Sequence, residues 1–210
     1  ENLNDWQSDI DEALSLGVQH ISAYSLMYEE GTPLFRLLNE KKIKEINEET
    51  SLKMYEMLIE SLTSNGFEHY EISNFALPGY RSKHNSSYWK QIPYLGIGAS
   101  AHSYNIVSRQ WNIADVKDYI RFVNSSSHEY IEETEHLTDT ERYNDIITTT
   151  LRTSDGIDTR TLPQRHRDFI LKASQKHIAL GNLSLDNGII RLTRQGLFIS
   201  DSIMVDLIEE

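Results

Sequence analysis

Helical and strand patterns alternate along the first part of the chain, and this alternation restricts the folds that it can adopt. Residues 4–16 and 48–65 carry apolar side chains at helical spacing, and a glycine that can end a helix follows each segment. Residues 20–26 and 69–75 are short, largely apolar runs that predict strands. Strands separated by helices are typical of an α/β sheet with crossover connections. We therefore predict an α/β fold here, with one more strand at residues 95–101.

A polar, acidic segment at residues 125–136 separates this part from a second one with a different pattern. Beyond it, Thr138 and Glu141 have the spacing of a capping box at the start of a helix. Residues 167–180 are again amphipathic, and the Asp-Asn-Gly sequence at 186–188 predicts a hairpin. Helices with a two-stranded hairpin are typical of a small winged-helix-like domain. The predicted organisation is a first domain at 1–124, a linker at 125–136 and a C-terminal domain at 137–210.

The charge and composition exclude several classes of protein. The net charge is −12, which opposes binding to nucleic-acid phosphates or to anionic membranes. No apolar run approaches the roughly 20 residues that a membrane-spanning helix needs. The chain has no cysteine, so it cannot form disulfides or supply thiolates to zinc or to an iron–sulfur cluster. We expect a cytoplasmic protein that binds no nucleic acid, and a chain that begins inside a longer protein.

The most informative segment is residues 84–89, with the sequence HNSSYW, followed closely by residues 94–102, with the sequence YLGIGASAH. Histidine can ligate a metal or carry a proton near neutral pH, and aromatic rings suit a planar ligand. Small residues allow a ligand to approach the backbone. The structural alternative is that Tyr88, Trp89 and Tyr94 belong to the core while His84 is an ordinary loop residue.

Gly96-x-Gly98 is superficially similar to a dinucleotide-binding loop, but the third glycine is missing. We reject that interpretation and expect a narrow strand end with His102 at its tip. Tyr24 lies near the end of the strand at 20–26, where α/β proteins commonly bind ligands, although a core position is the alternative. Glu71 is a weaker site candidate, because no second carboxylate at a meaningful spacing accompanies it.

Several blocks of the sequence, taken in order, resemble the radical-SAM haem chaperones of the HemW type, which are often described as oxygen-independent coproporphyrinogen III oxidase-like proteins. The resemblance covers nearly the whole chain, and its ordered blocks make it more specific than any single motif. The blocks are residues 20–26, 30–34, 70–76, 84–89, 96–103 and 196–201.

The resemblance implies that the chain is the last part of a partial (β/α)6 radical-SAM barrel followed by a small winged-helix-like domain. It implies a parent enzyme that holds a [4Fe–4S] cluster and S-adenosylmethionine, with the cluster's cysteines outside this chain. It also implies that His84, Asn85, Tyr88 and Trp89 bind haem, with His84 as a haem-iron ligand. Tyr24 and His102 match positions that contact S-adenosylmethionine. No catalytic residue is assigned.

Three functions remain open at this point. The first is binding of haem, or of a porphyrinogen, and delivery of haem to an acceptor protein. The second is oxidative decarboxylation of coproporphyrinogen III by the same superfamily. The third is a non-catalytic winged-helix interaction module. Without thiolates, we expect this segment alone to be catalytically inactive. A chain that lacks most of the barrel strands leaves an open sheet edge, which predicts either a paired or swapped homodimer or rearranged strands.

Overall fold

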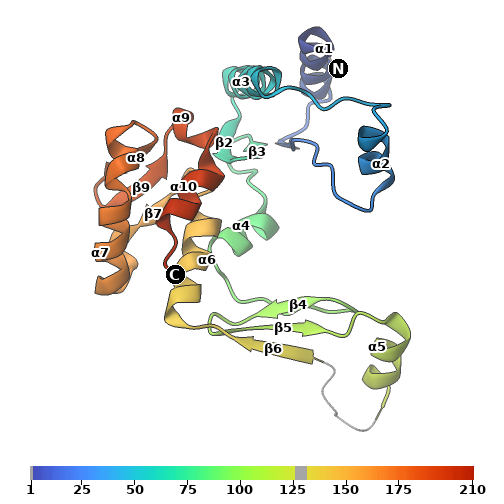
Figure 1. Ribbon diagram of the computed structural model, residues 1–210, viewed down its shortest axis with the longest axis vertical. Coiled ribbons are helices and arrows are strands. Elements are labelled where there is room, and N and C mark those ends of the chain that lie inside the picture. Colours follow the sequence, from blue (N-terminus) through green and yellow to red (C-terminus); the bar gives the residue numbers. More distant parts are fainter. Residues whose placement is uncertain (1, 126–131) are drawn as a thin grey trace. The chain divides into compact units, whose positions relative to one another are not determined.

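The computed structural model describes residues 2–125 and 132–210, and these form two compact units (Figure 1). The first unit comprises Glu1–Ser82 and the second Lys83–Glu210. Among the described residues, no helix is both long and apolar enough to span a bilayer. Each unit is described separately below.

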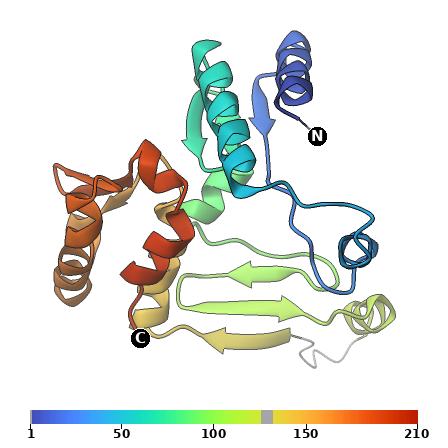
Figure 2. The same cartoon turned by 45° about the horizontal axis from the view of Figure 1, so that its top comes forward.

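In the first unit, two helices pack beside each other against a three-stranded sheet (Figure 2). The helices in contact are α1 (Leu3–Ser15) and α3 (Glu48–Ser64), and a short helix α2 (Pro33–Asn39) lies between them in the chain. The strands are β1 (His20–Ser22), β2 (Glu68–Glu71) and β3 (Asn74–Ala76). Their apolar faces meet in one core, formed by Ile10, Leu58, Ile59, Leu62, Phe67 and Phe75.

The prediction of a single strand at residues 69–75 is wrong, because the chain reverses its direction at residues 72–73, between β2 and β3. Glu71 Oε2 accepts hydrogen bonds from the Ser73 amide at 2.9 Å and from Asn74 Nδ2 at 2.5 Å, which closes a tight turn between β2 and β3. The sheet order is β1-β3-β2, with both pairings antiparallel. β1 and β2 therefore run in the same direction, as a crossover connection requires, but β3 lies between them.

The strand predicted at residues 20–26 is shorter than expected. β1 ends at Ser22, and residues 23–29 have no regular structure. Tyr24, Leu26 and Met27 are 71%, 64% and 74% exposed, so this segment is not the buried strand that its apolar residues predicted. The pattern of a short apolar run does not by itself determine whether the run is a strand, and here the strand that pairs with it lies far away in the sequence.

The second unit begins with helix α4 (Lys83–Trp89) and continues into an antiparallel sheet in the order β4-β5-β6. Its strands are β4 (His102–Tyr104), β5 (Ser108–Asn112) and β6 (Glu132–His136), and helix α5 (Val116–Val123) lies between β5 and β6 in the chain. The predicted linker at 125–136 is thus a strand over its last five residues. Residues 126–131 lie outside the described part of the chain.

β6 forms because its polar side chains find partners on β5. Trp111 Nε1 donates to Glu133 Oε2 at 3.1 Å, and Arg109 lies opposite Glu135 in the strand register. Cross-strand pairs of this kind stabilise a sheet although the strand itself has no apolar pattern. The boundary between the two compact units lies after Ser82, so these units differ from the predicted division into 1–124 and 137–210. As a division into domains, 1–124 and 137–210 stays a prediction.

The strand predicted at residues 95–101 is also wrong. Only Tyr94 pairs, through an isolated bridge to Tyr104, and the residues after it form a loop. The loop is held from two sides: Tyr119 Oη accepts from the Gly98 amide at 3.0 Å, and Asn112 Nδ2 donates to the Gly98 carbonyl at 2.9 Å. The glycines allow this close folding of the backbone. In the sequence alone, the pattern of this segment resembled a strand interrupted by glycines.

The C-terminal part agrees with the predicted winged-helix-like layout. A three-stranded sheet in the order β7-β9-β8 lies beside a set of helices, and the predicted hairpin turns at Asn187 and Gly188, both with positive φ. The elements are α6 (Asp139–Thr150), β7 (Ile157–Asp158), the 3-10 helix η1 (Thr159–Thr161), α7 (Gln164–Ala173), α8 (Gln175–Ala179), β8 (Leu183–Asp186), β9 (Ile189–Leu192), α9 (Arg194–Leu197) and α10 (Ser200–Leu207).

The predicted capping box at the start of α6 is present. Thr138 Oγ1 accepts from the Glu141 amide at 3.2 Å, and the Glu141 carboxylate accepts from the Thr138 amide at 2.7 Å. We expect Thr138→Ala to lower the free energy of unfolding by about 1 kcal/mol, because an amide at the helix start loses its partner. Urea unfolding measures this. Thr138→Ser keeps the hydroxyl, so an equal loss in both variants would contradict the capping role.

Candidate functional site

Helix α4 presents two of the predicted haem-binding residues on one exposed face. His84 and Tyr88 are four residues apart, which places them on the same side of a helix. Their rings meet edge to face, with centroids 5.0 Å apart and an interplanar angle of 89°. His84 is exposed and Tyr88 is 40% exposed. An accessible imidazole next to an aromatic ring can ligate the iron of a planar ligand while the ring contacts the ligand's apolar surface.

The other two predicted residues lie on a different side of the same helix. Asn85 and Trp89 are partly buried, and α4 packs against α6. The Trp89 carbonyl accepts a hydrogen bond from Thr150 Oγ1 of α6 at 3.1 Å. The predicted motif therefore combines an exposed pair, His84 and Tyr88, with two partly buried residues, Asn85 and Trp89, and the backbone of Trp89 links α4 to α6.

Tyr94 extends the aromatic surface beyond α4, although it is not among the predicted ligand-binding residues. Its ring meets that of Tyr88 at 4.8 Å and 73°, and it lies 6.0 Å from the ring of Tyr104. Burial raises the pKa of Tyr94, and the neighbouring Tyr88 adds to this effect. In the sequence, Tyr94 follows the aromatic residues of 84–89 closely. Its backbone bridge to Tyr104 holds it where its ring contacts that of Tyr88.

His102 is the first residue of β4 and its side chain is exposed, so it begins this strand and does not end the strand that was predicted at residues 95–101. Its ring stacks on Trp111 of β5 at 5.9 Å and 29°, and the two residues face each other in the sheet register. The backbone of His102 lies directly against Gly96, where a Cβ would meet the His102 carbonyl oxygen at 2.2 Å. The glycine thus permits the close backbone approach that the small residues of this segment predicted.

Tyr24 belongs to the first unit, in the exposed segment after β1, whereas His84 and His102 belong to the second unit. Close to it in the chain, Ser22 Oγ donates to Asn74 Oδ1 at 2.6 Å, and Asn74 in turn binds Glu71. Glu71 is only 3% exposed. Its hydrogen bonds to the turn give it a structural role, so the structure does not favour Glu71 as a site residue.

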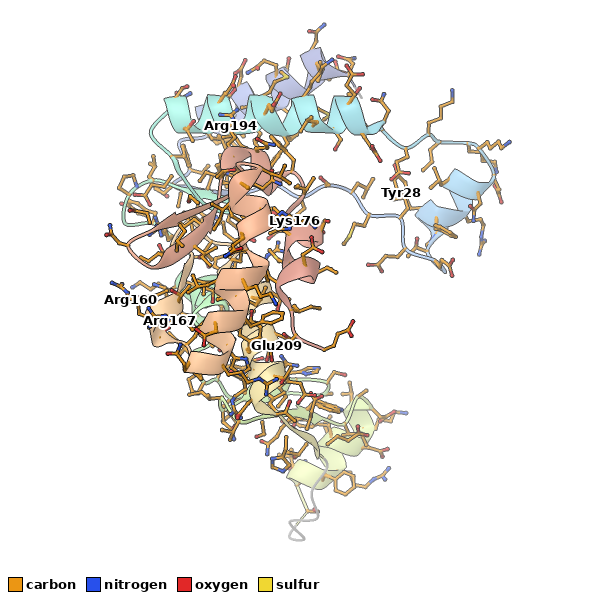
Figure 3. All side chains as sticks on the ribbon, turned by 60° about the vertical axis from the view of Figure 1, so that its left-hand side comes forward. Tyr28, Arg160, Arg167, Lys176, Arg194 and Glu209 are labelled. Atoms are coloured by element: carbon orange, nitrogen blue, oxygen red, sulfur yellow. The ribbon has the colours of Figure 1, made fainter. Side chains whose placement is uncertain are left out.

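Two arginines of the C-terminal part have acidic partners. Arg165 pairs with Glu209 at 2.8 Å, and the Arg160 guanidinium forms two hydrogen bonds with Asp158, whose pKa it lowers to about 2. Figure 3 labels Arg160 and Glu209 among the side chains of this part. His166 is buried and stacks on Tyr143 at 4.6 Å. These pairings use local acidic partners, which weakens the case for binding to nucleic acid.

No group of three or more histidine, cysteine, aspartate or glutamate side chains with the geometry of a metal site occurs in the described ranges, 2–125 and 132–210. The chain also has no cysteine. Without thiolates, its residues do not fit an iron–sulfur cluster. An exposed histidine such as His84 can still ligate haem iron, because the porphyrin supplies the other four ligands.

Comparison with known proteins identifies relatives for the whole chain. Residues 137–199 match the HemN C-terminal domain family. The haem chaperone HemW of Bacillus subtilis is 30% identical over 207 residues, which cover 97% of this chain and 54% of that protein. The haem chaperone HemW of Lactococcus lactis is 37% identical over 115 residues, which cover 55% of this chain and 30% of that protein.

Among solved structures, the radical-SAM enzyme coproporphyrinogen III oxidase (HemN) from Escherichia coli is similar, with a TM-score of 0.70 and 16% identity. The match covers 99% of this chain and 52% of that one. This likeness confirms the predicted fold class, the last part of a radical-SAM barrel followed by a small C-terminal domain. The chain spans about half or less of the length of the proteins that it matches.

Proposed function

Because the chain belongs to the family of HemW-type radical-SAM haem chaperones and corresponds to their C-terminal portion, we propose that it binds haem on helix α4 and contributes to delivering that haem to an acceptor protein. The observation that carries the proposal is the exposed His84–Tyr88 pair, with Tyr94 behind it. Asn85 and Trp89, which are partly buried, belong to the same haem-binding segment, and His84 supplies a nitrogen ligand to the haem iron.

Titration with haem tests the proposal on the full chain. We expect His84→Ala to bind haem about tenfold or more weakly and to lose the Soret shift of the wild-type complex, because the iron loses its axial ligand. His136→Ala is a matched control, since His136 is an exposed histidine of the same unit on β6. An unchanged Soret band and affinity in His84→Ala would remove His84 as the ligand.

The radical chemistry of the family requires residues that this chain does not contain. A [4Fe–4S] cluster and S-adenosylmethionine supply radical chemistry in radical-SAM proteins, and the cluster's thiolates must come from outside this chain. We propose that Tyr24 and His102 contribute contacts to S-adenosylmethionine in the whole protein. The chain alone is then inactive in cleaving S-adenosylmethionine.

The second candidate function is oxidation of coproporphyrinogen III. It is supported by the HemN C-terminal domain match and the fold likeness, whereas the curated relatives support haem binding. The whole protein, incubated with coproporphyrinogen III, a reductant and S-adenosylmethionine, separates the two functions, because only the oxidase forms vinyl groups. The winged-helix interaction module ranks third, since Arg160 and Arg165 are paired with acidic residues and the chain has a net charge of −12.

Two further expectations accompany the haem proposal. β1 and β2 are the outer strands of their sheet, so their outer edges offer backbone groups for pairing with a second copy of the chain. We also propose a cytoplasmic location, where a haem-acceptor protein would meet this protein.

A further inference from the structure

Three tyrosines of the second unit have their rings in contact one after another. The ring centroids of Tyr88 and Tyr94 lie 4.8 Å apart at an interplanar angle of 73°, and those of Tyr94 and Tyr104 lie 6.0 Å apart at 34°. Exposure decreases along this row: Tyr88 is 40% exposed, Tyr94 is partly buried and Tyr104 is 7% exposed. Edge-to-face contact contributes to packing, and it also holds two phenols where they can react with each other.

The composition of the chain directs one-electron oxidation towards its aromatic side chains. An exposed cysteine thiolate is readily oxidised, but this chain has no cysteine. A one-electron oxidant then acts on electron-rich rings, and a phenol that loses one electron and its hydroxyl proton becomes a phenoxyl radical. Because Tyr88 is exposed, an oxidant in solution reaches its ring directly.

Burial distinguishes the two neighbours of Tyr94. A phenoxyl radical forms only where the hydroxyl proton has an acceptor, which is water for a phenol at the surface. In the part of the chain that the structure describes, the buried hydroxyl of Tyr104 has no hydrogen-bond partner, so no neighbouring group is in place to accept its proton. Tyr94 is partly exposed, and its ring lies closer to Tyr88 than to Tyr104. The geometry therefore favours a reaction between Tyr88 and Tyr94.

We propose that Tyr88 and Tyr94 form an oxidative modification site, at which a one-electron oxidant joins the two rings in a dityrosine cross-link. Each phenol gives one electron to an equivalent of the oxidant and its hydroxyl proton to water. The two radicals form a carbon–carbon bond between ring positions next to the hydroxyls, and the hydrogens at those positions then move to the oxygens. The net change is the loss of two electrons and two protons. Contact between the rings makes the coupling intramolecular, which raises its rate.

The cross-link joins helix α4 covalently to a segment that is fixed to β4. The backbones of Tyr94 and Tyr104 exchange two hydrogen bonds, each from an amide to a carbonyl at 2.9 Å. On the other side of the new bond, the ring of Tyr88 contacts that of His84. Oxidation therefore restricts the exposed pair of α4. The reaction itself requires no haem, so it stands or fails independently of the proposed function.

Photo-oxidation of the full chain with tris(bipyridine)ruthenium(II) and persulfate tests this proposal, because light then generates a one-electron oxidant without haem. Trypsin cleaves after Lys90, which places Tyr88 on the peptide 84–90 and Tyr94 on the peptide 91–109. We expect mass spectrometry to find these two peptides linked and lighter by two hydrogen atoms than their sum. The yield per molecule should not depend on protein concentration. It should fall about tenfold or more in Tyr88→Phe and in Tyr94→Phe.

Two further variants control for other tyrosines, and both should keep the linked peptides. Tyr104→Phe is needed because Tyr104 lies on the same tryptic peptide as Tyr94. Tyr80→Phe removes a tyrosine of the first unit that is 56% exposed. Loss of the linked peptides in Tyr104→Phe would assign the coupling to Tyr104 and overturn the proposed pair. Links that form only between molecules, or oxidation of Tyr88 without a link, would overturn the proposal as well.

Discussion

Gly96→Ala is expected to destabilise the second unit by about 2–4 kcal/mol. A Cβ at this position would lie 2.2 Å from the carbonyl oxygen, 2.7 Å from the carbonyl carbon and 2.8 Å from the amide nitrogen of His102. These are backbone atoms of β4, so they cannot move aside as the end of a flexible side chain can. Either the strand or the loop of residues 95–101 must shift.

Urea unfolding followed by tryptophan fluorescence measures this effect, because Trp89 and Trp111 both belong to the second unit. Ile97→Ala is the matched control: Ile97 is 83% exposed, so its truncation should change the free energy of unfolding by about 0.5 kcal/mol or less. The Gly96→Ala protein should also bind haem more weakly, since Tyr94 lies close to the shifted loop. If Gly96→Ala unfolded at the same urea concentration as the wild type, the backbones of Gly96 and His102 would not be in close contact.

Glu71→Ala is expected to destabilise the first unit by about 2–4 kcal/mol, because it removes a buried acceptor from two donors. The Ser73 amide and Asn74 Nδ2 both donate to the same carboxylate oxygen, and Asn74 is itself 2% exposed. Without Glu71, these donors are left unpaired at the turn between β2 and β3. The link from Asn74 to Ser22 of β1 also loses its support.

Glu68→Ala provides the comparison within the same strand. The Glu68 carboxylate binds Arg81 at 2.8 Å, but the two side chains are 41% and 36% exposed, so we expect a loss of about 1 kcal/mol or less. Glu71→Gln keeps one acceptor oxygen and should fall between the two alanine variants. Thermal or urea unfolding of all three measures the order. If Glu68→Ala were as destabilising as Glu71→Ala, burial of the hydrogen-bonded carboxylate would not be the source of the effect.

The histidine and aromatic residues of 84–89 predicted a ligand-binding segment, and this assignment stays a prediction. Four-residue spacing is sufficient to place His84 next to Tyr88 once a helix is assumed. The difference in exposure within the motif, with His84 and Tyr88 exposed and Asn85 and Trp89 partly buried, could not be predicted. It depends on where α6 lies, and α6 follows α4 by about 50 residues.

Local signals thus predicted the helices α1, α3 and α6, the capping box at Thr138 and the hairpin turn at Asn187 and Gly188, because each depends on residues close together in the chain. Only the tertiary structure decided the reversal at Glu71 and the strand character of residues 132–136. The turn at Ile72 and Ser73 contains neither glycine nor proline and is closed by the carboxylate of Glu71, and β6 gains its partners from β5 across the sheet. Strand formation depends on pairing and burial more than on intrinsic preference, so an acidic segment without an apolar pattern becomes a strand wherever a matching neighbour lies beside it.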